Sequence, residues 1–546
     1  MPRNFYTTYL ITLYGKPTAP IVEARLRAII ERYRNQIEVP TRCDLNEKDV
    51  MLITYGDQIQ REGEPPLQTL SCFCERYLKE VISSVHLLPF YPWSSDDGFA
   101  IMNFRAVDPA LGSWSDIERL GHSFRLMFDG VINHASAQGN WFQAFLRNEA
   151  PYRDYFITVD GNPDLTQVVR PRTLPLLHEY QTSLGPRRVW TTFSADQVDL
   201  DYHNPEVLLT ILEILLEYVI RGASFLRLDA IAYLWKELGT SCYHLPQTHA
   251  FVQLLRAVLE DVAPFVRLIT ETNVPHQENI SYFGDGSNEA HLVYNFALPP
   301  LVLHTFLSGD STVLSDWAAD LQTPSAQTFF FNFLASHDGI GINPVRDILP
   351  QRDIDALVQA TLAHGGCVSY SSSAGLSQRP YELNISYFDA LSNPSGTEAV
   401  SLQVKRFLTA QAIMLSLRGL PGIYFHSLFG SRNWNAGVVQ SGQKRRINRE
   451  KLTLHVLENQ LENPAEIRSQ VFNGYSKLLQ QRSSSKAFHP SAEQEVLHLG
   501  RGIFGLLRTT MDKSERILCL HNVTPETQTA GTWTLAPYET KWVSIP

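Results

Sequence analysis

Cysteine, continuous hydrophobic runs and clustered positive charge are all scarce in this chain of 546 residues, and each shortage excludes a class of protein. Six cysteines spread over this length do not form the dense framework of a small disulfide-stapled domain, which favours free thiols in a reducing compartment. The N-terminus, Met1-Pro2-Arg3, lacks a basic start followed by an apolar stretch. We therefore expect no signal peptide and a cytoplasmic location.

The most apolar segment, 208–220, is short and is interrupted by Glu213 and Glu217. A membrane span needs about 20 consecutive apolar residues, so this segment is predicted to be a buried amphipathic helix. Lysine and arginine number 46 against 56 aspartates and glutamates, and one short basic run, 444–446, stands out. We therefore expect neither a membrane nor a nucleic acid as partner.

No pattern of residues marks a metal site. Cys72 and Cys74 flank Phe73, but no second pair of cysteines or histidines completes the set that a zinc site requires. Hydrophobic residues make up 44% of the chain and charged residues 19%, which are ordinary values for a globular protein with a sizeable core.

Short apolar runs that end in polar residues alternate with helix-like stretches along much of the chain. The strand-like runs are 85–90, 126–129, 225–229, 268–271, 329–338 and 422–425, and the clearest helical stretches are 21–33, 205–219 and 249–259. Buried parallel strands have this continuous apolar pattern. Repeated β-then-α units predict either a parallel barrel or a doubly wound sheet.

Two long stretches interrupt the alternation. Residues 136–204 are rich in proline, arginine and aromatics and show no clear helix or strand, and 339–398 are rich in proline, glycine and serine. Loops of this length are usually functional or form small inserted domains. Beyond about 487 the pattern changes to short β-like pieces. We expect an N-terminal helical segment (1–50), a catalytic domain (51–135, 205–338 and 399–486), two insertions (136–204 and 339–398) and a C-terminal β domain (487–546).

Four predicted strands end in ionisable side chains. These are Asp129 with Asn133 and His134, Arg227 with Asp229, Glu271, and His337 with Asp338. In a parallel barrel the active site lies at the C-terminal ends of the strands. Carboxyl groups at several such ends suit glycosidic chemistry, in which one attacks the anomeric carbon and another protonates the departing oxygen.

Arg227 and Asp229 are two residues apart on a predicted strand, so their side chains point into the same site. The arginine favours the ionised form that a nucleophile needs. Glu271 follows apolar residues, a setting that raises the pKa of a general acid. A lone aspartate at a strand end is more often a helix cap, and a lone histidine such as His134 is more often structural. The groups taken together favour catalysis.

The order of these groups is similar to the four signature regions of the α-amylase superfamily. The matches are D-x-x-x-N-H at 129–134, R-x-D at 227–229, Glu271, and H-D at 337–338. Further segments resemble the sucrose phosphorylase branch of that superfamily: 85–90, 95–99, 111–114, 189–193, 239–242, 336–341 and 445–449. The resemblance covers nearly the whole chain. It implies an α/β fold, a (β/α)8 TIM barrel with two inserted loop-rich subdomains and a small C-terminal β domain.

The resemblance also implies a retaining double displacement that needs no metal or cofactor. Asp229 would form a covalent β-glucosyl-enzyme, Glu271 would first protonate the leaving group, and Asp338 would bind and distort the sugar. Phosphate, rather than water, would then release α-glucose 1-phosphate. The remaining positions that match the glucose pocket of the branch are Asp96, Phe99, His134, Phe193, Arg227, His337 and Arg445.

A further set of positions matches the phosphate and acceptor sites of the branch: Arg172, Tyr233, Asn273, Tyr381 and Glu382. The guanidinium of Arg172 suits a phosphate or a glycerate carboxylate, although a surface arginine in a loop is the alternative. Sucrose phosphorylases usually carry Gln at 382 and His at 273, so both departures put sucrose in doubt. Segments 52–58, 269–276 and 380–385 resemble the branch members that act on glucosylglycerate.

We therefore expect an enzyme, monomeric or homodimeric, whose partners are a small α-glucoside and inorganic phosphate. The favoured acceptor is D-glycerate, and sucrose, sucrose 6'-phosphate or glucosylglycerol phosphorolysis is the alternative. A hydrolase or transglucosidase is a second interpretation, which indifference to phosphate would identify. A sugar-binding relative without activity is a third, and the presence of Asp229, Glu271 and Asp338 argues against it.

Overall fold

The computed structural model describes residues 5–40, 43–171, 174–371 and 379–546. Its centre is a closed barrel of eight parallel strands, in which each strand pairs with the next barrel strand along the chain. The strands are β1 (Met51–Thr54), β3 (Ser84–Leu87), β4 (Arg125–Gly130), β9 (Ala223–Leu228), β10 (Arg267–Thr270), β11 (Leu292–Tyr294), β12 (Phe329–Asn332) and β16 (Leu420–Tyr424). The predicted barrel is confirmed, whereas the doubly wound sheet is wrong.

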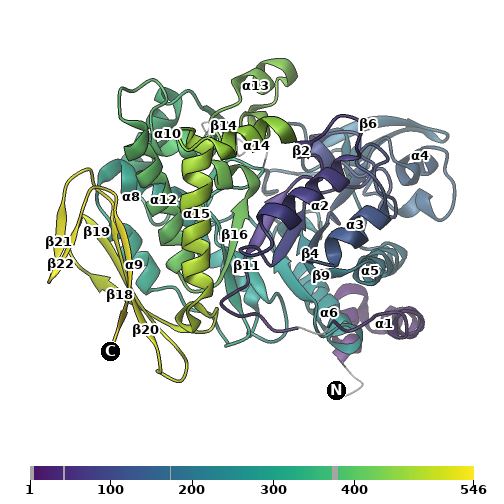
Figure 1. The fold of residues 1–546 in the computed structure, drawn as a ribbon. Helices are drawn as coiled ribbons and strands as arrows, with labels where there is room; N and C mark the ends of the chain where they lie inside the picture. The colour runs from purple at the N-terminus through teal and green to yellow at the C-terminus, as the bar shows by residue number, and fades with distance from the viewer. Residues whose placement is uncertain (1–4, 41–42, 172–173, 372–378) are drawn as a thin grey trace.

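Nearly every residue of these strands is buried, because the barrel interior covers one face and helices cover the other. The principal covering helices are α2 (Pro66–Tyr77), α3 (Trp114–Gly121), α5 (Pro205–Ile220), α6 (Pro246–Val262), α8 (Leu298–Ser308), α9 (Thr312–Ala319), α12 (Val400–Ser416) and α15 (Ile467–Ser483). Figure 1 shows α2, α3, α5, α6 and α15 ranged around the strands. Strands β1 and β11, of four and three residues, lie outside the predicted strand-like runs.

The apolar segment at 208–220 is part of α5, as predicted, and its two glutamates bind the N-terminal helix. Pro205 opens α5, and the side chain of Asn204 accepts a hydrogen bond from the backbone N–H of Glu206. Helix α1 (Phe5–Arg34), which breaks at Gly15, packs on α5 and α6. The hydroxyl of Tyr33 in α1 donates to Glu213 and Glu217.

The stretch 136–204 is more ordered than its composition predicts. It contains helix α4 (Asn140–Leu146), the hairpin β6 (Leu177–Thr182) and β7 (Gly185–Trp190), and strand β8 (Gln197–Asp199), which pairs with β5 (His134–Ser136). The prediction of no helix or strand here is wrong. Strands β5 and β8 have three residues each and pair residues far apart in the chain, such as His134 with Asp199, whereas β6 and β7 form a local hairpin. In Figure 1 the region of α4 and β6 stands beside the barrel.

The stretch 339–398 is also more ordered than predicted. It contains β13 (Ile340–Gly341), a helix of 13 residues, α10 (Gln351–Ala363), and α11 (Tyr387–Leu391). Strands β14 (Cys367–Ser371) and β15 (Arg379–Asn384) complete a three-stranded sheet with β13. This sheet brings β15, which carries two predicted site residues, against the loop that follows β12.

The C-terminal residues form an antiparallel sheet beside the barrel, drawn in yellow in Figure 1. Its four strands are β18 (Glu493–His498), β19 (Ile503–Thr509), β20 (Arg516–Asn522) and β23 (Thr540–Ile545). The small hairpin of β21 (Gln528–Ala530) and β22 (Trp533–Leu535) adjoins it. The β character of this region is as predicted, and the domain boundaries themselves stay a prediction.

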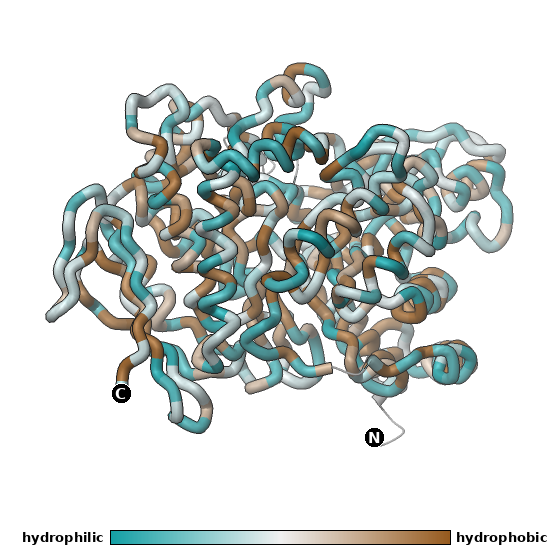
Figure 2. Tube along the Cα trace, viewed as in Figure 1, coloured by the Kyte–Doolittle hydropathy of each residue, from teal (hydrophilic) through white to brown (hydrophobic). Residues whose placement is uncertain are grey.

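Figure 2 shows hydrophobic positions concentrated inside the molecule and hydrophilic ones along the loops and outer helix faces. Among the described residues, none of the helices combines the length and the apolar character needed to span a membrane.

Candidate active site

A cavity of about 660 Å³ opens at the C-terminal end of the barrel strands and contains the three predicted catalytic carboxyl groups. Asp229 directly follows β9, and Glu271 directly follows β10. Asp338 lies in the loop after β12, because that strand ends at Asn332, so its predicted place at a strand tip is wrong. The other predicted residues that line the cavity are Asp96, Phe99, His134, Phe193, Tyr233, Asn273, His337, Tyr381 and Arg445.

Arg227 lies beneath the cavity and joins the carboxyl groups of three neighbouring strands. Its guanidinium forms an ion pair with Asp129 in β4, lies 3.0 Å from Oδ1 of Asp229, and lies 3.8 Å from Oε2 of Glu271. The predicted pairing of Arg227 with Asp229 is confirmed. Asp129 also contacts Nε2 of the buried His86, at 2.8 Å. Burial alone would raise the pKa of Asp129, but Arg227 and His86 outweigh it and lower this pKa to about 2.

Asp229 and Glu271 respond differently from Asp129 to the same arginine. Burial raises the pKa of Asp229 well above its usual value, and Arg227 opposes this rise without cancelling it. Burial also raises the pKa of Glu271, as predicted. Arg227 does favour the ionised form of Asp229, as predicted, but burial has the larger effect on this pKa. Carboxyl groups gathered away from water repel one another's charge, so the ionisation of one raises the pKa of the other.

Asp338 has the opposite electrostatic setting, because cations surround it. Oδ1 lies 2.5 Å from Nη1 of Arg445 and 3.6 Å from Nη2 of Arg449. Burial would raise the pKa of Asp338, but these two arginines, with His337 and Arg227, hold it below its usual range. Asp338 thus favours its anionic form, in a cavity whose other two carboxyl groups have raised pKa values.

One wall of the cavity is aromatic. The ring of Phe99 stacks on that of His337 with centroids 4.9 Å apart and planes 5° from parallel. On the adjoining wall, Phe193 packs against His134 and lies edge-on to Tyr233. Such apolar surfaces suit the faces of a sugar ring. Burial lowers the pKa of His337 well below its usual value, so its imidazole is neutral.

The tautomer of His134 follows from a buried lysine that sequence reasoning missed. Nζ of Lys236 lies 2.6 Å from Oδ1 of Asn133, so the amide of Asn133 presents its N–H groups to Nδ1 of His134. The proton of His134 is therefore on Nε2, which donates to the backbone oxygen of Phe99 at 2.9 Å.

Lys236 also binds Asp199 in β8, with 2.5 Å between Nζ and Oδ2. Asp199 in turn accepts hydrogen bonds from the backbone and the hydroxyl of Thr192, the residue before Phe193. Through Asn133 and Asp199, the ammonium group of Lys236 thus connects the segments that carry His134 and Phe193 to the chain after Asp229. No pattern in the sequence separates this lysine from an exposed one.

Replacing Lys236 by methionine is expected to destabilise the fold and lower activity together. The substitution leaves Asp199 as a buried carboxylate without its cation, and breaking such a pair costs about 3–5 kcal/mol. The thermal midpoint and the rate of glucoside cleavage measure the two effects. Lys477→Met, on the exposed side of α15, is the matched control. An unchanged thermal midpoint for Lys236→Met would show that the ammonium group does not stabilise the fold.

Asn273 and Tyr381 line the part of the cavity that adjoins β13. The side chain of Asn273 lies against Gly341, where a Cβ would approach Oδ1 to 2.6 Å, so a larger residue at 341 would displace the amide. Oδ1 of Asn273 is buried and has no hydrogen-bond partner among the described residues. Asn273 therefore presents an acceptor to the cavity that no described protein group uses.

Glu382 does not line this inner cavity, and its predicted contact with the acceptor stays a prediction. It lines an outer cavity of about 1260 Å³ that shares Asp96, Phe193, Gln197 and Arg445 with the inner one. Its carboxylate forms a two-pronged contact with Arg445, at 3.0 Å and 2.6 Å. Arg445 is held there because a carboxylate matches both prongs of its guanidinium.

Two further positions complete the comparison with the sequence. Arg172 lies outside the described residues, although Pro171 lines both cavities. Gln197, which the sequence did not single out, lines both cavities, and its amide donates to Oδ2 of Asp96 at 3.2 Å.

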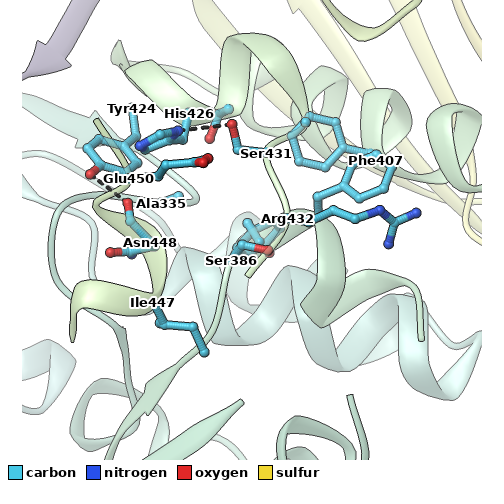
Figure 3. A pocket seen from close by; sticks show the side chains of 14 residues that line it. Ala335, Ser386, Phe407, Tyr424, His426, Ser431, Arg432, Ile447, Asn448 and Glu450 are labelled. Atoms are coloured by element: carbon cyan, nitrogen blue, oxygen red, sulfur yellow. Dashed lines mark hydrogen bonds between the residues drawn. The ribbon is translucent and has the colours of Figure 1, made fainter. Parts of the chain in front are cut away.

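A separate cavity of about 350 Å³ is lined by residues that include Tyr424, His426 and Glu450 (Figure 3). Ile447 and Asn448 form part of its wall, and Tyr424 donates a hydrogen bond to the backbone oxygen of Asn448. Of the described residues that line it, Glu450 is the one carboxylate. A single carboxyl group cannot supply the paired chemistry of glycoside cleavage. The inner cavity, which contains Asp229, Glu271 and Asp338, is therefore the candidate active site.

Among the described residues, no group of three or more His, Cys, Asp or Glu side chains is arranged to hold a metal ion.

Comparison with known proteins agrees with this geometry. Residues 75–339 match the family described as the alpha-amylase catalytic domain. The chain is 50% identical to the glucosylglycerate phosphorylase of Spirochaeta thermophila, over 94% of this chain and 87% of that protein. It is 30% identical to the sucrose phosphorylase of Agrobacterium vitis, over 82% of this chain and 90% of that protein.

Among solved structures, the sucrose 6F-phosphate phosphorylase from Thermoanaerobacter thermosaccharolyticum matches with a TM-score of 0.77 at 25% identity. The match covers 92% of this chain and 96% of that one. The chain belongs to the α-amylase family, within the branch that contains the sucrose phosphorylases, and is an enzyme, a glycoside phosphorylase.

Proposed function

We propose that this enzyme reversibly transfers the glucosyl group of 2-O-α-glucosylglycerate to inorganic phosphate, with α-glucose 1-phosphate and D-glycerate as products. The observation that carries the proposal is the convergence of Asp229, Glu271 and Asp338 in one cavity. The likeness to a glucosylglycerate phosphorylase, stronger than that to a sucrose phosphorylase, supports the choice of glycerate.

In the first displacement, Asp229 and Glu271 take different roles because Arg227 lies at different distances from their carboxyl groups. The guanidinium lies nearer Asp229, at 3.0 Å, than Glu271, at 3.8 Å, which favours the ionised form of Asp229 and leaves the shared proton on Glu271. Asp229 attacks the anomeric carbon, and Glu271 protonates the departing glycerate oxygen. Retention requires the two carboxyl groups to lie about 5–5.5 Å apart.

In the second displacement Glu271 is ionised and acts as a base. It takes a proton from phosphate while a phosphate oxygen attacks the anomeric carbon and breaks the ester bond to Asp229. The fixed anion of Asp338 faces the same cavity, where it accepts hydrogen bonds from sugar hydroxyls and stabilises positive charge on the ring. Neutral His337 and His134 complete the polar surroundings of the sugar.

The residues on the acceptor side of the cavity are suited to bind a small polar leaving group. Oδ1 of Asn273 is a buried acceptor without a protein partner among the described residues, beside Glu271. A glycerate hydroxyl is a suitable donor to it. Arg172 remains our proposed partner for phosphate or for the glycerate carboxylate, because the planar fork of a guanidinium can bind two oxygens of either anion.

A panel of glucosides tests the proposal. Release of glucose 1-phosphate would be followed with glucosylglycerate, sucrose, sucrose 6'-phosphate and glucosylglycerol, each with and without phosphate. We expect kcat/KM for glucosylglycerate to exceed the others by on the order of 10²-fold, since an unmatched polar group in the acceptor site is costly. Release should depend on phosphate.

A preference for sucrose by a similar margin would replace glycerate with fructose as the acceptor. Glucose release at an equal rate without phosphate would instead identify a hydrolase. Preparations of the Asp229→Asn variant serve as the blank for contaminating activities in both cases.

A further inference from the structure

The turn after β3 is strained in a way that the roles of Asp96 and Phe99 do not explain. Asp96 and Asp97 both have left-handed backbone angles, with φ of 55° and 49°, and Gly98 follows at 110°. A Cβ at Gly98 would lie 2.7 Å from the backbone oxygen of Pro89, which excludes any larger residue. Non-glycine residues held in this region cost on the order of 1–3 kcal/mol each. Strain of this kind persists only where surrounding contacts hold it.

The ion pairs that hold Asp97 in the turn come from the segment after β16. The carboxylate of Asp97 forms ion pairs with Arg446 and with Arg449, and in the second of these Oδ2 lies 2.6 Å from Nη1. The side chains of Asp97 and Arg449 are 10% and 2% exposed, so little solvent weakens this pair. Neither residue lines the inner cavity.

Arg449 connects the turn to the loop that presents Asp338. Its Nε donates to the backbone oxygen of His337 at 2.7 Å, and its Nη2 lies 3.6 Å from Oδ1 of Asp338. Asn448 adds hydrogen bonds to the backbone oxygens of Ser336 and Asp338. One guanidinium therefore spans the loops after β3, β12 and β16, and its charge is shared between Asp97 and Asp338.

We propose that Asp97 and Arg449 form a positioning pair that sets the location of Asp338 in the active site. Asp97 draws the guanidinium of Arg449 away from Asp338, which leaves that carboxylate paired with Arg445 and turned toward the sugar. Without Asp97, the anionic partner left within the reach of Arg449 is Asp338. The inference rests on the proposed function only in assigning Asp338 to the sugar.

The test is a double-mutant cycle between Arg449→Lys and Asp338→Asn, measured with α-glucosyl fluoride. Lysine keeps the charge but cannot span three loops. We expect Arg449→Lys to lower kcat/KM by on the order of 10²-fold, because small misplacement of a binding group is costly. In the Asp338→Asn background the same substitution should have an effect below about fivefold, since coupled residues are not additive.

The matched control is Arg446→Lys, which changes the other arginine on the same Asp97. This pair is partly exposed and Arg446 has no contact with the 336–338 loop among those described, so we expect a loss below about fivefold. Asp97→Asn provides a second route to the same result. Equal losses from Arg449→Lys in both backgrounds would overturn the proposal, and so would loss of the folded state in both Arg449→Lys and Asp97→Asn.

Glucosyl fluoride needs no leaving-group acid and no glycerate. The cycle therefore remains readable if the panel of natural glucosides overturns glycerate as the acceptor. A wild-type enzyme that cleaves the fluoride but ignores phosphate would refute the proposed function and leave the positioning pair to be judged by the cycle alone.

Discussion

Replacing Asp229 by asparagine is expected to lower kcat/KM for phosphorolysis by on the order of 10⁵-fold, because the covalent route is removed. The loss corresponds to about 7 kcal/mol of transition-state stabilisation. Asparagine keeps the size of the side chain and can still contact Arg227, which lies 3.0 Å from Oδ1. The fold and the binding of glucose should therefore survive, as thermal unfolding and calorimetry would show.

Mass spectrometry gives an independent readout for the same variant. A glucosyl adduct should accumulate on the wild-type enzyme when glucosyl fluoride is supplied without phosphate, and it should be absent from Asp229→Asn. Asp316→Asn, on the exposed face of α9, controls for the substitution itself. A variant at 229 that retained more than a small fraction of wild-type turnover would show that another group attacks the sugar.

Replacing Glu271 by glutamine is expected to lower kcat/KM for a glucoside with a poor leaving group by about 10³-fold, the usual contribution of a general acid. Glucosyl fluoride, which needs no proton to depart, should lose far less. The ratio of the two losses measures how much of the effect comes from proton transfer. Equal losses with both donors would indicate a positional role for Glu271.

The pH dependence of the wild-type enzyme tests the same assignment. Burial raises the pKa of Glu271, so its acid form persists to higher pH than that of an ordinary glutamate. kcat/KM for the natural glucoside should fall as pH rises through this pKa and the proton is lost. Glu271→Gln should remove that alkaline limb of the pH profile. Glu462→Gln, at an exposed position of α14 (Leu454–Glu462), should leave it unchanged.

The pattern of the sequence predicted buried parallel strands with ionisable groups at their ends, and the family resemblance selected a barrel over a doubly wound sheet. Asp229 and Glu271 follow apolar runs directly, and the carboxyl ends of parallel strands meet at one face. The separation of Arg227 and Asp229 by two residues was enough to place both in one site, because strand side chains alternate. These are local properties, set by residues within a few positions of one another.

The regular structure inside the two insertions was not predictable in this way. Strand β13 has two residues and depends on pairing with distant chain, Ile340 with Leu383. The β6–β7 hairpin is local, but few of its residues are buried, so it lacks a clear apolar alternation. Asp338 belongs to the same class. It lies six residues beyond the end of β12. The side chains of Asn448 and Arg449 hold its loop through hydrogen bonds to backbone oxygens.

By itself the sequence determined that Asp229, Glu271 and Asp338 belong to one α-amylase-type site. The tertiary structure decided their electrostatic states. Burial outweighs Arg227 and raises the pKa of both carboxyl groups at the strand ends, whereas Arg445 and Arg449 hold the pKa of Asp338 below its usual range. It also showed that the carboxylate of Glu382 binds the guanidinium of Arg445. Desolvation and Coulomb interactions depend on distances between atoms from different loops, and those distances exist only once the chain has folded.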